Sequence, residues 1–164
     1  MNIYPKQYLN SVKDISIDFL NKNNIKGIIL DVDNTLINLD KKMPEGIEQW
    51  VENMKRSGIK LCIVSNSNKK EKVAGVAKKI DVPYIFFAKK PLKSGFLRAQ
   101  KILEIKPENI AAVGDQIFTD VIGANRCKMF SILVKPIEEE RDYLITRIKR
   151  PIEKMIVNKY LNKQ

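Results

Sequence analysis

Histidine is absent from this sequence of 164 residues. Its absence excludes Ser-His-Asp and Cys-His catalysis, zinc sites that contain histidine, and imidazole acid–base chemistry. Cysteine is nearly absent too, because Cys62 and Cys127 form neither a C-x-x-C pair nor a disulfide framework. We expect Cys62, which lies in an apolar run, to be a buried side chain. An enzyme of this composition must work with carboxylates, lysines, hydroxyls and a hard cation.

Long apolar runs are also missing. No stretch approaches the roughly 18 apolar residues that a membrane-spanning helix needs, and residues 1–9 contain no apolar signal-peptide core. We therefore expect a cytoplasmic protein, with peripheral attachment to the inner face of the membrane left open. Lys and Arg number 30 against 19 Asp and Glu, which gives a formal net charge of +11. This charge favours an anionic partner such as nucleic acid or anionic lipid, although a general richness in Lys, Asn and Ile explains it equally well.

Five short apolar runs alternate with helical patterns along the chain. The expected strands are 27–32, 59–64, 84–87, 109–113 and 130–134, and the expected helices are 44–57, 69–80, 92–105 and 117–127. The strands are continuous apolar runs rather than alternating ones, which indicates burial on both faces. We predict an α/β fold with a doubly wound, Rossmann-like parallel sheet of about five strands.

We expect residues 1–164 to form one domain with an extension at each end. Residues 1–25 form an N-terminal arm, and residues 137–164 form a basic extension of one or two helices divided near Pro151. The apolar positions of this extension fall at helical spacing, at Ile145, Ile148, Ile152, Met155 and Ile156. Packing on the same chain or on another subunit, and contact with membrane or nucleic acid, all remain open.

Polar side chains follow four of the expected strands, at the edge of the sheet where ligands bind in such folds. They are Asp31 and Asp33, Ser65 and Asn66, Lys89 and Lys90, and Asp115. In extended backbone, Asp31 and Asp33 point the same way, and two convergent carboxylates repel unless a cation or a shared proton relieves them. Without histidine, an oxygen-ligated Mg²⁺ is the natural occupant. One carboxylate can attack phosphorus while the second protonates the leaving group, whereas the alternative is that both cap a turn.

These residues resemble the four motifs of the haloacid dehalogenase (HAD) superfamily of phosphatases. The matches are Asp31-Val32-Asp33-Asn34-Thr35-Leu36, Ser65 after an apolar strand, Lys90-Pro91, and Gly114-Asp115 with Asp120. More narrowly, the chain is similar to the YqeG-type, class IIIA HAD phosphatases, in the run that ends at Asn125 and in Thr146-x-x-x-Arg150-x-x-Glu153. Relatives of that group include phosphatidylglycerophosphate phosphatases, which act on a lipid head group.

The resemblance implies a role for each matching residue. Asp31 is then the nucleophile that forms an aspartyl-phosphate, and Asp33 is the general acid/base whose backbone carbonyl also binds Mg²⁺. The implied phosphate-binding residues are Ser65, Asn66 and Lys90, and the implied metal ligands are Asp31, Asp33, Asp115 and Asp120. Asn66 and Thr35 are weaker assignments, Thr35 as a residue that orients the first loop. Lys89 and Lys93 compete with Lys90 for the third motif.

The spacing of the motifs leaves no room for a cap domain, because only residues 36–43 separate the first motif from the next helix. A site without a lid excludes water poorly around a small substrate, so we expect a bulky phosphate ester. The main hypothesis is a Mg²⁺-dependent phosphomonoester hydrolase, with phosphatidylglycerophosphate as a candidate substrate. The alternatives are a nucleotide or polynucleotide-end phosphatase and a non-catalytic RNA- or ribosome-binding module, and a homo-oligomer also remains open.

Overall fold

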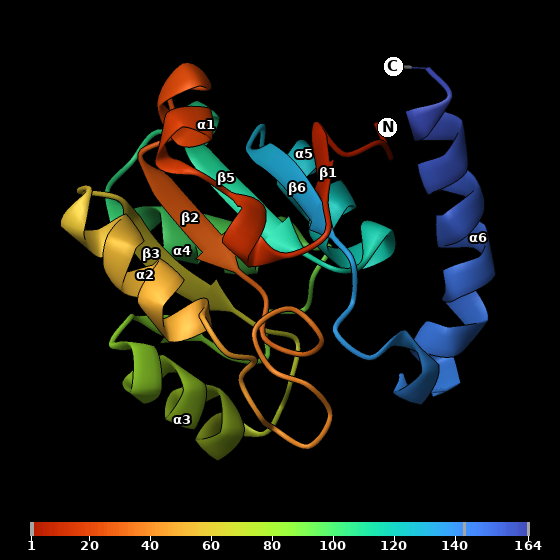
Figure 1. The fold of residues 1–164 in the computed structure, drawn as a ribbon, viewed down its shortest axis with the longest axis horizontal. Helices are drawn as coiled ribbons and strands as arrows, with labels where there is room; N and C mark the ends of the chain where they lie inside the picture. The colour runs from red at the N-terminus through yellow and green to blue at the C-terminus, as the bar shows by residue number, and fades with distance from the viewer. Residues whose placement is uncertain (1, 143, 164) are drawn as a thin grey trace.

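A parallel sheet of six strands forms the centre of the computed structural model, which describes residues 2–142 and 144–163 (Figure 1). In spatial order, its strands are β1 (Gln7–Leu9), β6 (Phe130–Val134), β5 (Ile110–Gly114), β2 (Gly27–Leu30), β3 (Lys60–Val64) and β4 (Tyr84–Ile85). Every pair of neighbouring strands is parallel. The predicted doubly wound α/β fold is therefore confirmed.

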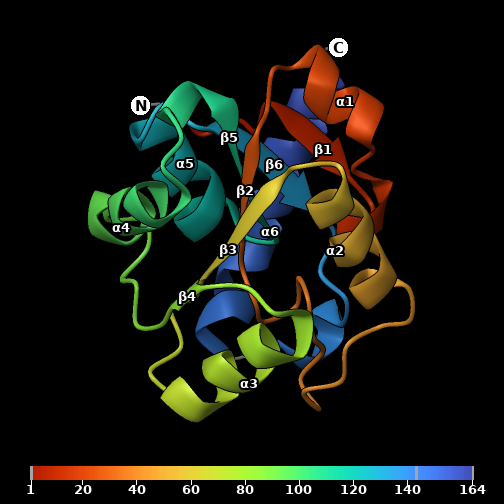
Figure 2. The ribbon, with the colours of Figure 1, turned by 90° about the vertical axis from the view of Figure 1, so that its left-hand side faces the viewer.

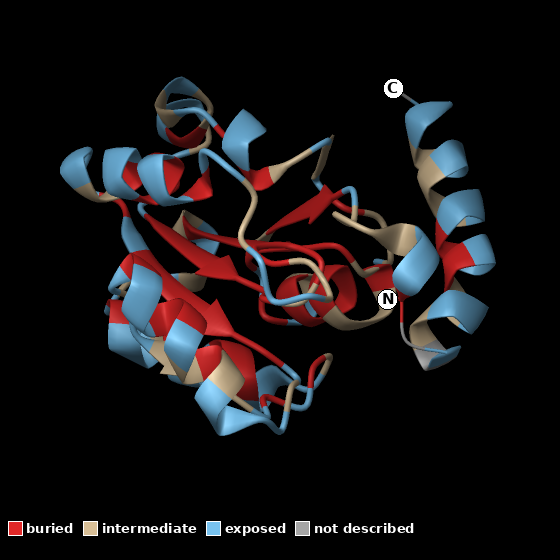
Figure 3. Ribbon diagram, turned by 60° about the horizontal axis from the view of Figure 1, so that its bottom comes forward, coloured by how far each residue is buried: buried red, intermediate tan, exposed pale blue. Residues whose placement is uncertain are grey.

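Helices cover both faces of this sheet (Figure 2). One face is covered by α1 (Ile17–Lys22), α2 (Ile47–Arg56) and α3 (Lys70–Ile80), and the other by α4 (Lys93–Leu103) and α5 (Ile122–Arg126). Alternate residues of one strand enter different cores: Ile28 and Leu30 pack under α2, while Ile29 packs under α4. The central strands β2 and β5 are consequently buried along their whole length, and Figure 3 shows the centre of the sheet as buried.

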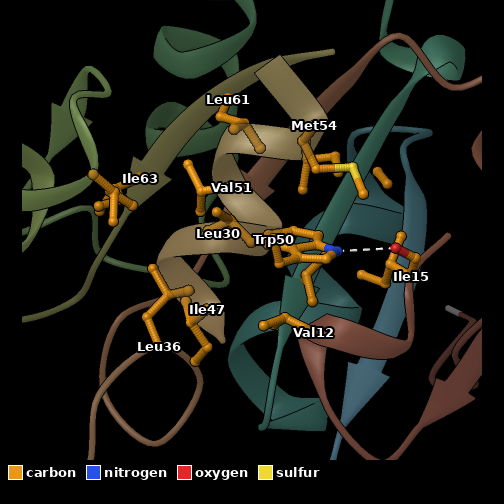
Figure 4. Packing of buried hydrophobic residues seen from close by; sticks show 14 of the residues in the cluster. Val12, Ile15, Leu30, Leu36, Ile47, Trp50, Val51, Met54, Leu61 and Ile63 are labelled. Carbon is orange, nitrogen blue, oxygen red and sulfur yellow. Dashed lines mark hydrogen bonds between the residues drawn. The ribbon is translucent and has the colours of Figure 1, made fainter. Parts of the chain in front are cut away.

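The packing of α2 illustrates how an apolar stripe fixes a helix to the sheet. Ile47, Trp50, Val51 and Met54 repeat at helical spacing and are all buried. The indole Nε1 of Trp50 donates a hydrogen bond of 2.9 Å to the backbone oxygen of Ile15, so the polar atom of this buried ring is satisfied (Figure 4).

Several elements differ from the sequence-based expectation, and the first expected strand, 27–32, already ends at Leu30. The sixth strand, β1, lies in the N-terminal arm and pairs with β6, which places the arm at the edge of the sheet. The third expected strand is shorter than 84–87, because β4 ends at Ile85. The expected helix 117–127 begins as a π-helix (Ile117–Val121) and continues as α5. The described residues also form three 3₁₀ turns, at Val12–Asp14, Pro107–Asn109 and Glu139–Arg141.

The C-terminal extension forms one helix, α6 (Leu144–Leu161), which stands beside the β1–β6 edge of the sheet (Figure 1). A division near Pro151 is wrong, because the helix continues through this residue. Proline removes a single helical hydrogen bond here, while the buried Arg150 and Glu153 hold the helix on either side of it. The side chain of Ile145 lies outside the described part. Within residues 2–142 and 144–163, no helix combines the length and the hydropathy that a bilayer-spanning helix requires.

Candidate active site

The candidate site lies where the chain reverses its direction across the sheet. From β2 the chain builds outward through β3 and β4, and then returns to place β5 on the opposite side of β2. Asp31 directly follows β2 and Asp115 directly follows β5, and the two strands are paired, with Leu30 opposite Val113. The crevice at such a switch point is where doubly wound sheets bind ligands.

Three buried carboxylates meet at this crevice. Asp31, Asp115 and Asp120 each offer an oxygen, and these oxygens all lie within 4.8 Å of one another. Asp120 reaches the other two from the π-helix, and its Oδ2 accepts a hydrogen bond of 3.1 Å from the backbone N–H of Gln116. Gly114 makes this approach sterically feasible, because a Cβ at that position would lie 2.2 Å from Asp120 Cγ. The Gly-Asp pattern of the sequence thus has a packing reason.

Lys90 places its ammonium group among these acids. Its Nζ lies 2.7 Å from Oδ1 of Asp31 and 2.6 Å from Oδ1 of Asp120, with only 3% of the side chain exposed. The two competing lysines point elsewhere: Lys89 places Nζ 5.1 Å from the ring centroid of Phe87, and Lys93 is exposed at the start of α4. Of the three lysines, Lys90 is therefore the one that enters the acidic cluster.

The other two predicted phosphate-binding residues, Ser65 and Asn66, directly follow β3. Ser65 is fully buried after β3, and its Oγ accepts a hydrogen bond of 3.1 Å from the N–H of Ser67. The side chain of Asn66 is bonded to the Lys90 backbone, accepting from its N–H at 2.6 Å and donating to its oxygen at 3.0 Å. This contact positions Lys90, while a direct contact between Asn66 and phosphate stays a prediction. Thr35, in the loop after β2, donates to Oδ1 of Asp115 at 3.3 Å. This bond connects the loop after β2 with the loop after β5.

The carboxylate of Asp33 does not join the buried triad, contrary to the simple expectation for residues two apart in extended backbone. The chain turns at once after Asp33, since Asn34 has a φ of +59° and Asp33 bridges to Ile37. Asp33 instead pairs with Lys72 of α3, whose Nζ lies 2.6 and 2.8 Å from its two oxygens. Sequence reasoning missed Lys72, because nothing in a helix rich in lysine marks the one that turns toward the site.

The environment of the triad shifts its protonation equilibria. Burial raises the pKa of Asp31 to about 7, a rise that the Lys90 ammonium opposes and the Asp120 carboxylate increases. Burial also raises the pKa of Asp115, with Asp31 and Asp120 adding to this effect and Arg150 opposing it. Burial alone would lower the pKa of Lys90, but Asp120 and Asp31 outweigh it and hold that pKa above its ordinary value.

The charge balance of the interior favours a bound cation. The buried charged side chains of the described residues are five acidic groups and two basic groups: Asp31, Asp115, Asp120, Asp142 and Glu153 against Lys90 and Arg150. Paired buried carboxylates are expensive unless they are neutralised, and three of these converge with oxygen donors only. The triad therefore has the donor type, spacing and charge that suit a divalent metal ion.

Comparison with known proteins agrees with this geometry. Residues 1–138 match the family described as mitochondrial PGP phosphatase. The chain is 39% identical over 156 residues to the probable phosphatase YqeG of Bacillus subtilis strain 168, a match that covers 94% of this chain and 89% of that protein. The chain belongs to the PGP phosphatase family. The predicted resemblance to YqeG is confirmed, and this PGP phosphatase family member is an enzyme, a phosphatase.

Solved structures share the fold of this PGP phosphatase family member. One is deoxy-D-mannose-octulosonate 8-phosphate phosphatase from Haemophilus influenzae in a cobalt-bound form, with a TM-score of 0.56 and 13% identity over 70% of this chain and 80% of that chain. Another is an uncharacterized protein from Listeria monocytogenes serotype 4b, with a TM-score of 0.55 and 22% identity over 73% of this chain and 86% of that chain. At these identities the likeness concerns the fold alone.

Proposed function

We propose that this phosphatase hydrolyses phosphomonoesters through an aspartyl-phosphate on Asp31, that Mg²⁺ is its cofactor, and that phosphatidylglycerophosphate is its substrate. The observation that carries the proposal is the position of Asp31. Its carboxylate stands at the switch point of the sheet, within hydrogen-bonding distance of the Lys90 ammonium and beside two further buried carboxylates. A nucleophile, a charge neutraliser for phosphate and a cation site thus occupy one crevice.

The cation would be held by Asp31, Asp115 and the backbone carbonyl of Asp33, with Asp120 as a further ligand or a partner of Lys90. Oxygen donors of this kind suit Mg²⁺, which keeps several waters and binds through one or two carboxylates together with substrate phosphate. When bound, it would neutralise charge on the phosphoryl group and reduce the repulsion between that group and Asp31.

The two chemical steps follow from the residues present. In the first step, an oxygen of Asp31 attacks phosphorus, the P–O ester bond breaks, and Asp33 gives a proton to the leaving oxygen. In the second step, water attacks the phosphorus, Asp33 takes its proton, and the bond to Asp31 breaks to release inorganic phosphate. Ser65 and Lys90 hold the phosphoryl oxygens in both steps. Lys72, which pairs with Asp33, must release it or follow it toward the leaving oxygen.

Two features support a bulky lipid ester as the substrate. The first is the family match itself. The second is the absence of a lid over the site in the described chain: β2 connects to α2 through residues 31–46, and β4 connects to α4 through residues 86–92. Both connections are too short for a cap domain. A head group presented on a membrane would itself cover such an open site and exclude water from it.

The outward face of α6 supports peripheral contact with an anionic membrane. It carries a stripe of apolar side chains that are between 53% and 72% exposed, namely Leu144, Ile148, Ile152 and Met155 (the α6 stripe). Basic residues accompany the stripe, at Arg147, Lys149, Lys154 and Lys159, whereas the single acidic residue of the helix, Glu153, is buried on the inner side. Such a helix suits an anionic lipid surface. Two copies of it facing each other would bring like charges together.

A phosphate-release assay with the full-length chain tests the proposal. Phosphatidylglycerophosphate in vesicles, glycerol 3-phosphate, nucleotides, a 5′-phosphorylated oligonucleotide and p-nitrophenyl phosphate are compared with Mg²⁺ and with excess EDTA. We expect the highest kcat/KM on the lipid, no turnover in EDTA, and no turnover by Asp31→Asn, because an amide does not attack phosphorus. Full activity in EDTA would refute the cation assignment, and a preference for nucleotides or oligonucleotide ends would replace the lipid as substrate.

A further inference from the structure

One arginine of the C-terminal helix reaches the acidic cluster. Arg150, on the inner side of α6, is 7% exposed. Its NH1 donates 2.7 Å to the backbone oxygen of Asp115, and its NH2 donates to Oδ2 of the same residue. Its Nε donates 2.7 Å to Oδ2 of Asp142, and NH1 also contacts Glu153 at 3.2 Å. Each of the three guanidinium nitrogens thus donates within one buried network.

The network connects the two loops that carry the chemistry. Asp142 accepts a hydrogen bond from the Asn34 side chain, in the loop that contains Asp33. Glu153 accepts from the backbone N–H groups of Ile117 at 2.7 Å and Phe118 at 3.2 Å, which begin the π-helix that carries Asp120. Through these contacts, α6 holds both the loop after β2 and the loop after β5.

We propose that Arg150 is a positioning residue that orients Asp115 for the cation and so makes α6 a part of the active site. The inference rests on the proposed function, in which Asp115 is a metal ligand. Arg150 engages Oδ2 and the backbone oxygen of Asp115, and the remaining Oδ1 is contacted by Thr35. Asp115 is consequently fixed at the backbone and at both side-chain oxygens. A carboxylate held in this way meets a cation in one orientation, without losing rotational freedom on binding.

A purely structural role for Arg150 makes a different prediction. If the network served only to attach α6 to the sheet, replacing Arg150 would lower the melting temperature and leave the affinity of the folded protein for Mg²⁺ unchanged. If Arg150 orients Asp115, the affinity for the cation falls as well. Hydrogen-bond partners of metal ligands typically contribute a factor of about 10 to 100 in metal affinity.

The experiment compares Arg150→Met and Arg150→Lys with the wild-type protein by calorimetric titration of the full-length chain with MgCl₂ alone. We expect the Kd for Mg²⁺ to rise about 10- to 100-fold in Arg150→Met and less in Arg150→Lys, which keeps the charge but not the fork. The turnover of p-nitrophenyl phosphate should show the same shift in the Mg²⁺ concentration required, with kcat recovering as Mg²⁺ is raised. Near-ultraviolet circular dichroism reports the folded fraction of each sample.

Arg141→Met is the matched control, because Arg141 also bridges two acidic residues, Asp40 and Glu138, but does so on the surface. It should leave the Kd for Mg²⁺ at the wild-type value. A wild-type Kd in folded Arg150→Met would overturn the inference and leave the proposed function intact. Should Arg150→Met not fold, a wild-type Kd in Arg150→Lys has the same consequence. A wild-type protein that does not bind Mg²⁺ would instead overturn the proposed function, and the inference with it.

Discussion

Two helices, α2 and α6, lie against the sheet with opposite sidedness. α2 buries an apolar stripe and exposes polar residues, Glu48, Gln49 and Glu52 among them. α6 buries Arg150 and Glu153 toward the site and exposes the α6 stripe, while its partly buried Ile156 and Val157 pack against a small hydrophobic cluster. The first arrangement is that of an ordinary amphipathic helix, whose burial of apolar area stabilises the fold. The second gives up much of that stabilisation, in keeping with the role that we propose for Arg150 at the site.

The comparison predicts that mutations in the two helices will separate stability from cation binding. Trp50→Ala in α2 should lower the free energy of unfolding by about 3–5 kcal/mol, because it removes the largest side chain of the stripe and leaves a cavity. The folded fraction should still bind Mg²⁺ with wild-type affinity, in contrast to the expectation for Arg150→Met. Urea denaturation followed by circular dichroism measures the first quantity, and calorimetry measures the second.

Trp50→Phe is the control for this prediction. It keeps most of the apolar volume and loses only the hydrogen bond to Ile15, so its loss of stability should be clearly smaller. A large change in Mg²⁺ affinity in folded Trp50→Ala would show that the two helices are not separable in function.

The second prediction uses pH, because the buried stripe of α2 has no titratable group whereas α6 packs against the acidic triad. Burial raises the folded-state pKa of Asp31 to about 7, from an ordinary value of 3.8. Between these values the unfolded chain has lost a proton that the folded chain still holds, so the free energy of unfolding falls as pH rises. The slope for one such group is about 1.4 kcal/mol per pH unit.

Urea denaturation of the protein in EDTA, at intervals from pH 4 to pH 8, measures this slope. Asp31→Asn lacks the titrating group and should show a shallower decline over the same range. At pH 8, added Mg²⁺ should restore stability to the wild-type protein, because in the proposed function the cation binds the ionised triad of the folded state only. Parallel curves for the wild-type and Asp31→Asn would contradict the raised pKa.

The sheet, and the meeting of Asp31, Lys90 and Asp115 at one of its edges, follow from local sequence patterns. Continuous apolar runs identify five of the six strands, and the polar residues that follow them lie at one edge of a parallel sheet. β1 is not predictable in the same way, since its three residues are only half-buried and its place is fixed by pairing with β6. The π-helix at Ile117 has no sequence signal that distinguishes it from an α-helix.

The long side chains of the site are the part that sequence reasoning does not reach. Lys72 and Arg150 each extend several ångströms from a helix, and their destinations depend on how that helix packs. A partial signal exists for Arg150, because Thr146, Arg150 and Glu153 share one helix face by their spacing. Two charged residues on the inner face of a helix indicate a buried ion network. The tertiary structure is still required to show that this network includes Asp115.

The smallest effect on stability is expected from the outward face of α6. Serine at Ile148, Ile152 and Met155 removes most of the α6 stripe, yet these side chains are exposed, so each change should alter the free energy of unfolding by no more than about 0.5 kcal/mol. Binding to phosphatidylglycerol vesicles should weaken at least tenfold, about 1.4 kcal/mol, because less apolar surface enters the interface.

Substitution of the α6 stripe is a sharper test than deletion of residues 137–164, because a deletion also removes Arg150 and with it a contact of the acidic cluster. Sedimentation with vesicles at low and high salt measures binding, which should weaken for the wild-type protein as salt shortens the Debye length. Gln49→Ser with Asn53→Ser, on the exposed side of α2, is the control and should bind vesicles as the wild-type does.

The triple variant, with serine at Ile148, Ile152 and Met155, decides the role of the α6 stripe. If it binds vesicles as well as the wild-type protein, the α6 stripe is excluded as a membrane contact. A wild-type dimer that the triple variant abolishes would assign the same face to a second copy of the chain, and turnover of lipid relative to p-nitrophenyl phosphate would then stay unchanged.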